Sequence, residues 1–354
     1  MKPYFSIIIP YHNSQDTIGP LLTSIALSKQ IPVVEVIVVD DGSEEKFLVH
    51  GSWVAEGKRR TTNYELRTIR LKANQGPAVA RNRGARVAKG KYLVFLDSDV
   101  VLLPDALHNL WKIYEDDPDI TAVTGVWMKH QQTTKFFPNF KALRDWSYWI
   151  NERDKSGYYY LFSTRIASIK REVFARLNGF DESYALPLVE DIEFTYRIAR
   201  RYAIIFAPNV RVRHEFEDFW PIAKKYFWRS YYWTKLYQGR KKFDPVATTL
   251  QEAVTALSGV GIVGMSLALV LFGGLFSVLP VSDIGGMSIL YQILFFLTLI
   301  SYLITLAIHL LLTRKFLTFV YHEKGLFFAV RSFLTGLVLY CFIAAGALWG
   351  RVHS

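Results

Sequence analysis

Residues 33–43 read VVEVIVVDDGS, an apolar run that stops abruptly at two aspartates and a glycine. A short run rich in valine and isoleucine, bounded by turn residues, is typical of a buried β-strand. Two further runs of this kind occur at residues 5–10 (FSIIIP) and 91–96 (KYLVFL). Helical patterns at 18–25 and 76–88 separate the runs, and such repeated β-α units predict an α/β fold with a mainly parallel sheet.

Acidic residues follow two of these predicted strands directly. Asp40 and Asp41 end one run, and Asp97 and Asp99 follow another. In an open parallel sheet, ligands bind outside the carboxyl ends of the strands. Two carboxylates in an Asp-x-Asp turn can hold Mg²⁺ or Mn²⁺ through oxygen, and that cation would bridge a diphosphate. Aspartate is also an ordinary turn residue, but its place after successive buried strands favours a nucleotide and metal site.

Several other classes of protein are excluded by motifs that the sequence lacks. It has no G-x-x-x-x-G-K-[ST] loop, no G-x-G-x-x-G after the first strand and no G-x-S-x-G elbow. Its single cysteine, Cys341, excludes an intrachain disulfide and a cysteine-rich metal site. The net charge of +11 suits an anionic lipid surface or phosphorylated small molecules. Nucleic acid is not expected as a partner, because no recognised binding motif is present.

A third acidic group lies at residues 190–193, which read EDIE and begin a predicted helix. Carboxylates at a helix N-terminus are stabilised by the helix dipole, and this is the structural explanation for Glu190 and Asp191. Three acids within four residues exceed what capping requires, however, and one of them could serve as a general base.

The final third of the chain is depleted in charge. Residues 250–354 hold five of the 42 Lys and Arg residues and three of the 31 Asp and Glu residues. Residues 253–282 and 284–313 contain none of these four types, and 325–350 contain only Arg331. Each run exceeds the roughly 20 residues that cross the apolar core of a bilayer, so the sequence predicts three transmembrane helices.

Lysine and arginine residues flank these predicted spans unequally. They occur at 240–242 and at 314–324, whereas the 281–286 connection has none. The positive-inside rule then keeps the N-terminal domain cytoplasmic and places the C-terminus outside, although Arg351 in the tail weakly opposes this. We therefore expect an integral protein of the plasma (cytoplasmic) membrane.

Residues 216–243 alternate aromatic side chains with lysine and arginine. This composition favours amphipathic helices that lie at a lipid interface, with membrane lipids as partners. The alternative is a folded aromatic core, although five cations would be out of place in one.

Taken together, the segments resemble the inverting family 2 glycosyltransferases of GT-A fold, over about residues 5–214. The resemblance rests on an ordered set of segments: IIPYHN at 8–13, VVDDGS at 38–43, NQGPAVARN at 74–82, FLDSD at 95–99, KREV at 170–173, GFDE at 179–182 and ED at 190–191. No single segment is specific, but the ordered set is. The family usually has tyrosine where this sequence has His12.

The resemblance implies a role for several residues in the first half of the domain. Pro10, His12 and Asp41 would line the nucleotide base and ribose, with Asp40 beside them. Arg81 would lie near the phosphates of the donor.

Further roles are implied around the sugar and the metal. Asp97 would contact the sugar or ribose beside the metal, and Asp99 would ligate the metal. Asp191 would be the catalytic base, with Glu190 as its neighbour. His214 resembles a histidine that many family members place after the last core strand, and it would be a further metal ligand.

The resemblance thus predicts a membrane-anchored enzyme that depends on Mg²⁺ or Mn²⁺ and builds a cell-envelope glycan or glycolipid. It would move a sugar from a nucleotide-diphosphate sugar, expected to be a UDP-sugar, to a hydroxyl of a lipid-linked or glycolipid acceptor. The alternative is a polyprenyl-phosphate glycosyltransferase, whose acceptor is already an anion and needs no base. The presence of Glu190 and Asp191 favours the hydroxyl acceptor. A processive synthase and a non-catalytic scaffold are less well supported.

The expected organisation has three parts. A GT-A catalytic domain occupies 1–215, with a nucleotide-sugar half at 1–103 and an acceptor half at 104–215. An interfacial amphipathic linker follows at 216–250, and a transmembrane domain occupies 251–354.

Overall fold

The computed structural model describes residues 2–45, 47, 64–152, 160–184, 188–241, 243, 249–278 and 285–353. The chain divides into two compact units. The first comprises Met1–Ala142 and Asp154–Phe216, and the second comprises Leu143–Arg153 and Glu217–Ser354. All the described strands belong to the first unit, whereas the second is helical.

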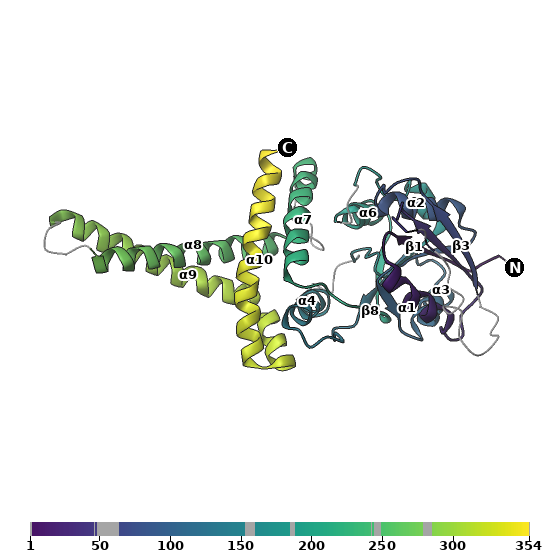
Figure 1. Ribbon diagram of the computed structural model, residues 1–354, viewed down its shortest axis with the longest axis horizontal. Coiled ribbons are helices and arrows are strands. Elements are labelled where there is room, and N and C mark those ends of the chain that lie inside the picture. Colours follow the sequence, from purple (N-terminus) through teal and green to yellow (C-terminus); the bar gives the residue numbers. More distant parts are fainter. Residues whose placement is uncertain are drawn as a thin grey trace. The chain divides into compact units, whose positions relative to one another are not determined.

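The first unit is built on an eight-stranded sheet with the order β3-β2-β1-β4-β7-β6-β8-β5 (Figure 1). Its strands are β1 (Phe5–Tyr11), β2 (Val34–Asp40), β3 (Tyr64–Arg70), β4 (Tyr92–Phe95), β5 (Val100–Leu102), β6 (Ala122–Trp127), β7 (Ala167–Lys170) and β8 (Ile204–His214). Strands β3, β2, β1 and β4 are parallel to one another. Their carboxyl ends therefore meet at one edge of the sheet, and Asp41 and Asp97 follow two of these ends.

The other half of the sheet mixes strand directions. β7 is antiparallel to both β4 and β6, β6 is parallel to β8, and β5 is antiparallel to β8. The predicted α/β fold with a mainly parallel sheet is confirmed. The pairing of Val100 with His214 brings the end of β8 next to the turn that follows β4.

Helices cover both faces of the sheet, with α2 on one side and α1 and α3 on the other in Figure 1. The helices of this unit are α1 (Gln15–Ala26), α2 (Pro77–Val87), α3 (Ala106–Asp116), the first part of α4 (Phe136–Ser147), α5 (Arg171–Arg176) and α6 (Glu190–Ala199). A Cβ at Gly84 of α2 would lie 2.6 Å from the side chain of Ile8 in β1, so α2 packs closely on the parallel strands. Strands β1 and β2 are buried along almost their whole length, as expected for parallel strands covered on both faces.

The second unit contains four long helices: α7 (Phe219–Arg240), α8 (Leu250–Val278), α9 (Gly285–Lys324) and α10 (Leu326–Val352). Within the described residues, three segments are long and apolar enough to cross a membrane: Leu250–Gly274, Leu290–Lys324 and Leu326–Val352. The prediction of three long apolar helices after the α/β domain is confirmed. Helix α9 continues beyond the predicted end of the second span, through Arg314 and Lys315. Residues 279–284, which end the first predicted span and form most of the predicted connection, lie outside the described residues.

The end of α4 and a short π-helix, η2 (Tyr148–Glu152), also belong to the second unit. Arg144 pairs with Glu152 at 2.9 Å and lies over the Phe316 ring of α9, 5.1 Å from its centroid. The Trp146 and Phe319 rings stack at 5.4 Å. These contacts fasten the segment Leu143–Arg153 to the cationic end of α9.

Candidate active site

The turn after β2 presents the Asp41 carboxylate to the N-terminus of α2. Gly42, in this turn, has a φ of +67°, and any Cβ there would collide with neighbouring backbone, so the turn requires glycine. Asp41 accepts hydrogen bonds from the amides of Gln75 and Gly76, both at 2.8 Å. These bonds hold the loop before α2 against the end of β2.

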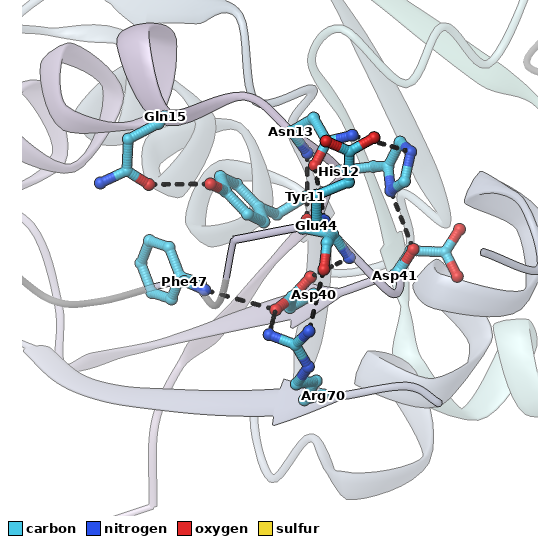
Figure 2. A network of polar contacts seen from close by, with 10 residues as sticks. Tyr11, His12, Asn13, Gln15, Asp40, Asp41, Glu44, Phe47 and Arg70 are labelled. Atoms are coloured by element: carbon cyan, nitrogen blue, oxygen red, sulfur yellow. Dashed lines mark hydrogen bonds and ion pairs between the residues drawn. The ribbon is translucent and has the colours of Figure 1, made fainter. Parts of the chain in front are cut away.

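Asp40 has a different environment, which Figure 2 shows. Its side chain accepts hydrogen bonds from the Ser43 amide at 2.9 Å and from Arg70 Nη1 at 3.1 Å. Asp40 is 2% exposed, and the Phe47 amide lies 3.4 Å from its second oxygen. Asp40 therefore stabilises the loop that follows β2, and its place beside a nucleotide stays a prediction.

His12 follows β1 and is exposed. Its Nδ1 lies 2.9 Å from the Asp41 carbonyl oxygen and its Nε2 lies 3.1 Å from Asn74 Nδ2 (the Asp41 contact is drawn in Figure 2). A carbonyl can only accept, so Nδ1 donates to it and Nε2 accepts from the Asn74 amide. Pro10 pairs in register with Val39. Pro10, His12 and Asp41 thus lie at the adjoining ends of β1 and β2, and their roles towards a nucleotide stay a prediction.

Arg81 of α2 joins two carboxylates from distant segments of the chain. Its Nη2 donates to Asp97 Oδ1 at 2.7 Å, and its Nη1 donates to Glu190 Oε1 at 2.8 Å. The Arg81 and Glu190 side chains are only 3% and 4% exposed, whereas Asp97 is 29% exposed. The bridge therefore connects the turn after β4 to the N-terminus of α6.

The charges of this bridge are held in place by their mutual attraction. Burial lowers the pKa of the Arg81 guanidinium, but the carboxylates of Asp97 and Glu190 outweigh that effect and raise it. Arg81 Nε and Glu190 Oε2 are buried and have no hydrogen-bond partner among the described residues. Both Nη groups of Arg81 donate to the two carboxylates. To contact the donor phosphates as predicted, Arg81 would have to bind them while it keeps these two ion pairs.

Asp191 begins α6 beside Glu190 and is half-buried. Its Oδ1 accepts a hydrogen bond from the Ile192 amide at 2.8 Å, and the helix dipole favours a carboxylate in this first turn. Its carbonyl accepts from the Thr195 hydroxyl at 2.6 Å, and that oxygen accepts from the Phe162 amide at 2.9 Å. The helix start is thereby fixed to the segment that leads into β7. The assignment of Asp191 as the base stays a prediction.

Asp99 and His214 are brought together by the pairing of β5 with β8. His214 Nε2 lies 3.4 Å from Asp99 Oδ2, and the Asp99 side chain is 50% exposed. Partial burial raises the pKa of the Asp99 carboxyl, but the hydrogen bond and charge of His214 and the charge of Arg165 outweigh it and hold the pKa below its usual value. Asp99 is therefore a carboxylate at neutral pH.

The donor set of this pair fits a divalent cation. A carboxylate oxygen and an imidazole nitrogen are ligands that Mn²⁺ accepts, and His214 Nδ1 is buried without a hydrogen-bond partner in the described part of the chain. No group of three or more His, Cys, Asp or Glu side chains among the described residues is arranged to hold a metal ion. Asp99 and His214 could thus supply two ligands, leaving further positions for a diphosphate and water. The predicted metal contact of Asp97 stays a prediction.

Two residues at this edge of the sheet were not assigned a role from the sequence. Asn74 lies within a segment that carries the family resemblance, but its contact with His12 depends on the loop conformation. Arg165 precedes β7, and its guanidinium carbon lies 4.8 Å from the Trp127 ring centroid. A single arginine before a strand gives no sequence signal, because its neighbours come from other strands.

A mainly parallel sheet with Asp41, Asp97, Asp99 and the α6 acids gathered at its carboxyl edge defines a GT-A-like domain, here followed by three long apolar helices. Residues 6–176 match the family model described as "Glycosyl transferase family 2". These residues are therefore similar to members of glycosyltransferase family 2.

Curated relatives match parts of the chain. An uncharacterized glycosyltransferase of Haemophilus influenzae is 29% identical over 198 residues, which cover 54% of this chain and 61% of that protein. The uncharacterized glycosyltransferase YibD of Escherichia coli is 32% identical over 123 residues, 34% of each chain. The chain therefore spans less than two thirds of the length of these relatives.

One solved structure resembles the whole chain. The mannosyltransferase PcManGT of Pyrobaculum calidifontis, in complex with GDP-Man and Mn²⁺, has a TM-score of 0.54 and 17% sequence identity. The match covers 100% of this chain and 88% of that one. At this identity the match supports the GT-A fold and carries nothing on substrate.

Proposed function

We propose that this protein is a membrane-associated inverting glycosyltransferase. It would move a sugar from a nucleotide-diphosphate sugar, a UDP-sugar in our proposal, to a hydroxyl of a lipid-linked or glycolipid acceptor in cell-envelope glycan synthesis. The observation that carries the proposal is the Arg81 bridge. It holds Asp97, at the predicted donor site, and Glu190, next to the predicted base, on a single guanidinium.

The bridge matters because donor and base must act on opposite sides of one sugar carbon. In a single in-line displacement, the acceptor oxygen attacks as the diphosphate leaves, and the configuration inverts. Holding the reacting groups in this geometry is a large part of enzymatic rate enhancement. Glu190 is buried and paired with Arg81, whereas Asp191 is half-buried at the start of α6, and we assign proton transfer to Asp191.

The Asp191 carboxylate would take the proton of the acceptor hydroxyl during attack. Its Oδ1 already accepts the Ile192 amide, which fixes the side chain at the helix start. Asp99 and His214 would hold Mg²⁺ or Mn²⁺. When bound, such a cation neutralises charge that develops on a departing diphosphate.

The three long apolar helices associate the protein with a membrane. The lysine and arginine residues near Arg240 and Arg314 support a cytoplasmic position for the catalytic domain in the plasma membrane. The predicted external C-terminus requires that α10 crosses the bilayer, and it stays a prediction.

Slow, metal-dependent hydrolysis of the donor tests this proposal without knowledge of the acceptor. We expect the full chain in detergent to release UDP from a UDP-sugar in the presence of Mn²⁺, and release to stop with a chelator. Asp99→Asn should lower the rate at least about 10²-fold, because a lost metal ligand removes several kcal/mol of charge stabilisation. Asp119→Asn, an exposed acid outside the site, is the matched control.

The measurement is nucleotide release from a panel of UDP-, GDP- and other nucleotide sugars. If no nucleotide is released from any of these sugars with any metal tested, the result would contradict the proposed enzymatic activity. It would favour a non-catalytic scaffold that retains the fold.

A further inference from the structure

Arg165 lies at the edge of the sheet where the candidate active site forms. In the antiparallel pairing of β4 with β7, Phe95 lies opposite Ala167. Arg165 lies in the turn two residues before Ala167, and Asp97 follows Phe95 by two residues. The charge of Arg165 also acts on the neighbouring Asp99 carboxyl.

The Arg165 guanidinium stacks on two aromatic rings. Its carbon lies 4.8 Å from the Trp127 ring centroid and 5.6 Å from the Phe216 ring centroid. It makes no hydrogen bond or ion pair with any residue that the structure describes, although the residue is half-buried. A guanidinium carries five N–H donors in a rigid fork. Stacking fixes the orientation of the guanidinium, so its N–H groups are positioned to donate hydrogen bonds to an anion.

A second cation strengthens the positive potential there. The Lys141 ammonium lies 5.1 Å from the centroid of the same Phe216 ring, and Lys141 is 3% exposed. The His214 ring contacts that ring as well, at 4.5 Å. Two cations and an imidazole thus surround one aromatic ring beside the carboxylate of Asp99.

We propose that Arg165 binds a phosphoryl oxyanion of a substrate in this site. The inference rests on the proposed function, because it places the anion where the sugar would be transferred. The planar fork matches two phosphoryl oxygens, and stacking on Trp127 limits the entropy lost on binding. Two substrates could carry the phosphoryl group: the donor, in its diphosphate, or an acceptor with a phosphate near the reacting atom.

The test measures binding, without turnover, to the full chain in detergent. Inorganic pyrophosphate with Mg²⁺ represents the donor diphosphate, and dodecyl phosphate represents a phosphorylated lipid acceptor. Arg165→Gln should weaken one of the two about 10- to 100-fold, the usual effect of losing charge-assisted hydrogen bonds. Arg165→Lys should recover only part of the loss, because an ammonium lacks the fork. Arg211→Gln, an exposed arginine on β8, is the control.

Each outcome decides between the sources or against the inference. Loss of pyrophosphate binding alone assigns Arg165 to the donor, and loss of dodecyl phosphate binding alone assigns it to the acceptor. Unchanged binding of both probes in Arg165→Gln overturns the inference and leaves the proposed function standing. Failure of the wild-type protein to bind either probe would count against both.

A separate observation concerns α10, the third predicted span. Its last turns pack along α7, as Figure 1 shows for the yellow and green-teal helices. A Cβ at Gly346 would collide with the Phe227 carbonyl oxygen, and one at Gly350 would lie 2.7 Å from the Tyr231 carbonyl oxygen. Only glycine allows this close backbone approach.

Helix α7 carries too many charges to lie beside a helix within the apolar core of a bilayer. It carries five cationic residues in 22, namely Lys224, Lys225, Arg229, Lys235 and Arg240. Lys225 forms an ion pair with Glu217, and both side chains are nearly half exposed. Charges of this kind are strongly disfavoured in the apolar core of a bilayer but suit its headgroup region.

The middle of α10 also lies near the cationic end of α9. The Tyr340 ring lies 5.5 Å from the ring of His309, which precedes Arg314 by five residues. A Cβ at Gly259 of α8 would lie 2.7 Å from the Tyr340 ring. Helix α10 therefore meets the α8–α9 pair near the end of α9 that bears lysine and arginine.

From this packing we infer that α10 lies along the membrane interface with α7, and that only α8 and α9 cross. The C-terminus then lies on the same side of the membrane as α7. This arrangement places Arg351 on the side where lysine and arginine collect, as the positive-inside rule favours. This inference differs from the sequence-based prediction of an external C-terminus, because hydropathy alone does not record that α10 packs against a cationic helix.

Reporter fusions to the full chain in bacterial cells test this topology. We expect a fluorescent protein fused after Ser354 to fluoresce and alkaline phosphatase at the same point to be inactive, because the first folds in the cytoplasm and the second requires the oxidising exterior. Alkaline phosphatase inserted at Asp283, between α8 and α9, should be active and shows that the pair crosses. An active phosphatase after Ser354 would establish that α10 crosses and overturn the inference.

Discussion

Asp191→Asn is expected to lower sugar transfer severely while the protein still binds its nucleotide-sugar donor. The amide keeps the shape of the side chain and its hydrogen bond from the Ile192 amide, but it cannot take a proton from an acceptor hydroxyl. A positioned general base contributes typically about 10²–10⁴-fold to the rate, so kcat should fall by that factor. Single-turnover transfer and donor binding, measured on the same preparation, separate the two effects.

Glu193→Gln is the matched control, since Glu193 is a third acid in the first turn of α6. Its carboxylate pairs with Arg197 at 2.6 Å and contacts none of the proposed site residues in the described structure. We expect near-normal kcat in that variant. Normal turnover in Asp191→Asn would instead favour the polyprenyl-phosphate alternative, in which the acceptor is already an anion and needs no base.

Arg81→Met is expected to destabilise the first unit severely. The substitution fills similar space but leaves the buried Glu190 carboxylate without its partner. Removing one member of a buried ion pair costs about 3–5 kcal/mol, because the remaining charge is neither solvated nor paired. Thermal unfolding, monitored by intrinsic protein fluorescence, should show a correspondingly lower midpoint temperature. Transfer activity should fall as well.

Arg86→Met provides the comparison on the same helix. Arg86 pairs with Glu182 at 3.0 Å, but the two side chains are 58% and 41% exposed. An exposed pair of this kind contributes about 0–1 kcal/mol. The double variant Arg81→Met with Glu190→Met should be more stable than Arg81→Met alone, since it removes the stranded charge. Equal unfolding midpoints for Arg81→Met and Arg86→Met would show that the bridge contributes little.

Strands β1, β2 and β4 and helices α1 and α2 were predictable because local sequence pattern determines them, whereas β5, β6, α3 and α4 were not predicted. The run at 33–39 is apolar at every position except Glu35. A continuous apolar run of this kind indicates a strand covered on both faces, and β2 is such a strand. The placement of acidic residues directly after these strands was predictable for the same reason. The candidate site was predictable to the extent that parallel strands end at a common edge.

The partners of Arg81 could not be read from the sequence. Glu190 lies 109 residues away along the chain and Asp97 lies 16 residues away. Their meeting depends on the order in which β4, β7 and α6 pack. The same is true of Asp99 and His214, which meet because β5 runs antiparallel to β8.

By itself the sequence determined an α/β domain with acidic turns after its strands, followed by three long apolar helices. Hydrophobic period and the absence of charge are local properties, and they settle such elements without reference to the rest of the chain. Tertiary structure alone decided which charges are paired and which are available. Pairing depends on distances between segments, so only the folded chain shows that Arg81 joins two carboxylates while the Arg165 guanidinium stacks on two aromatic rings.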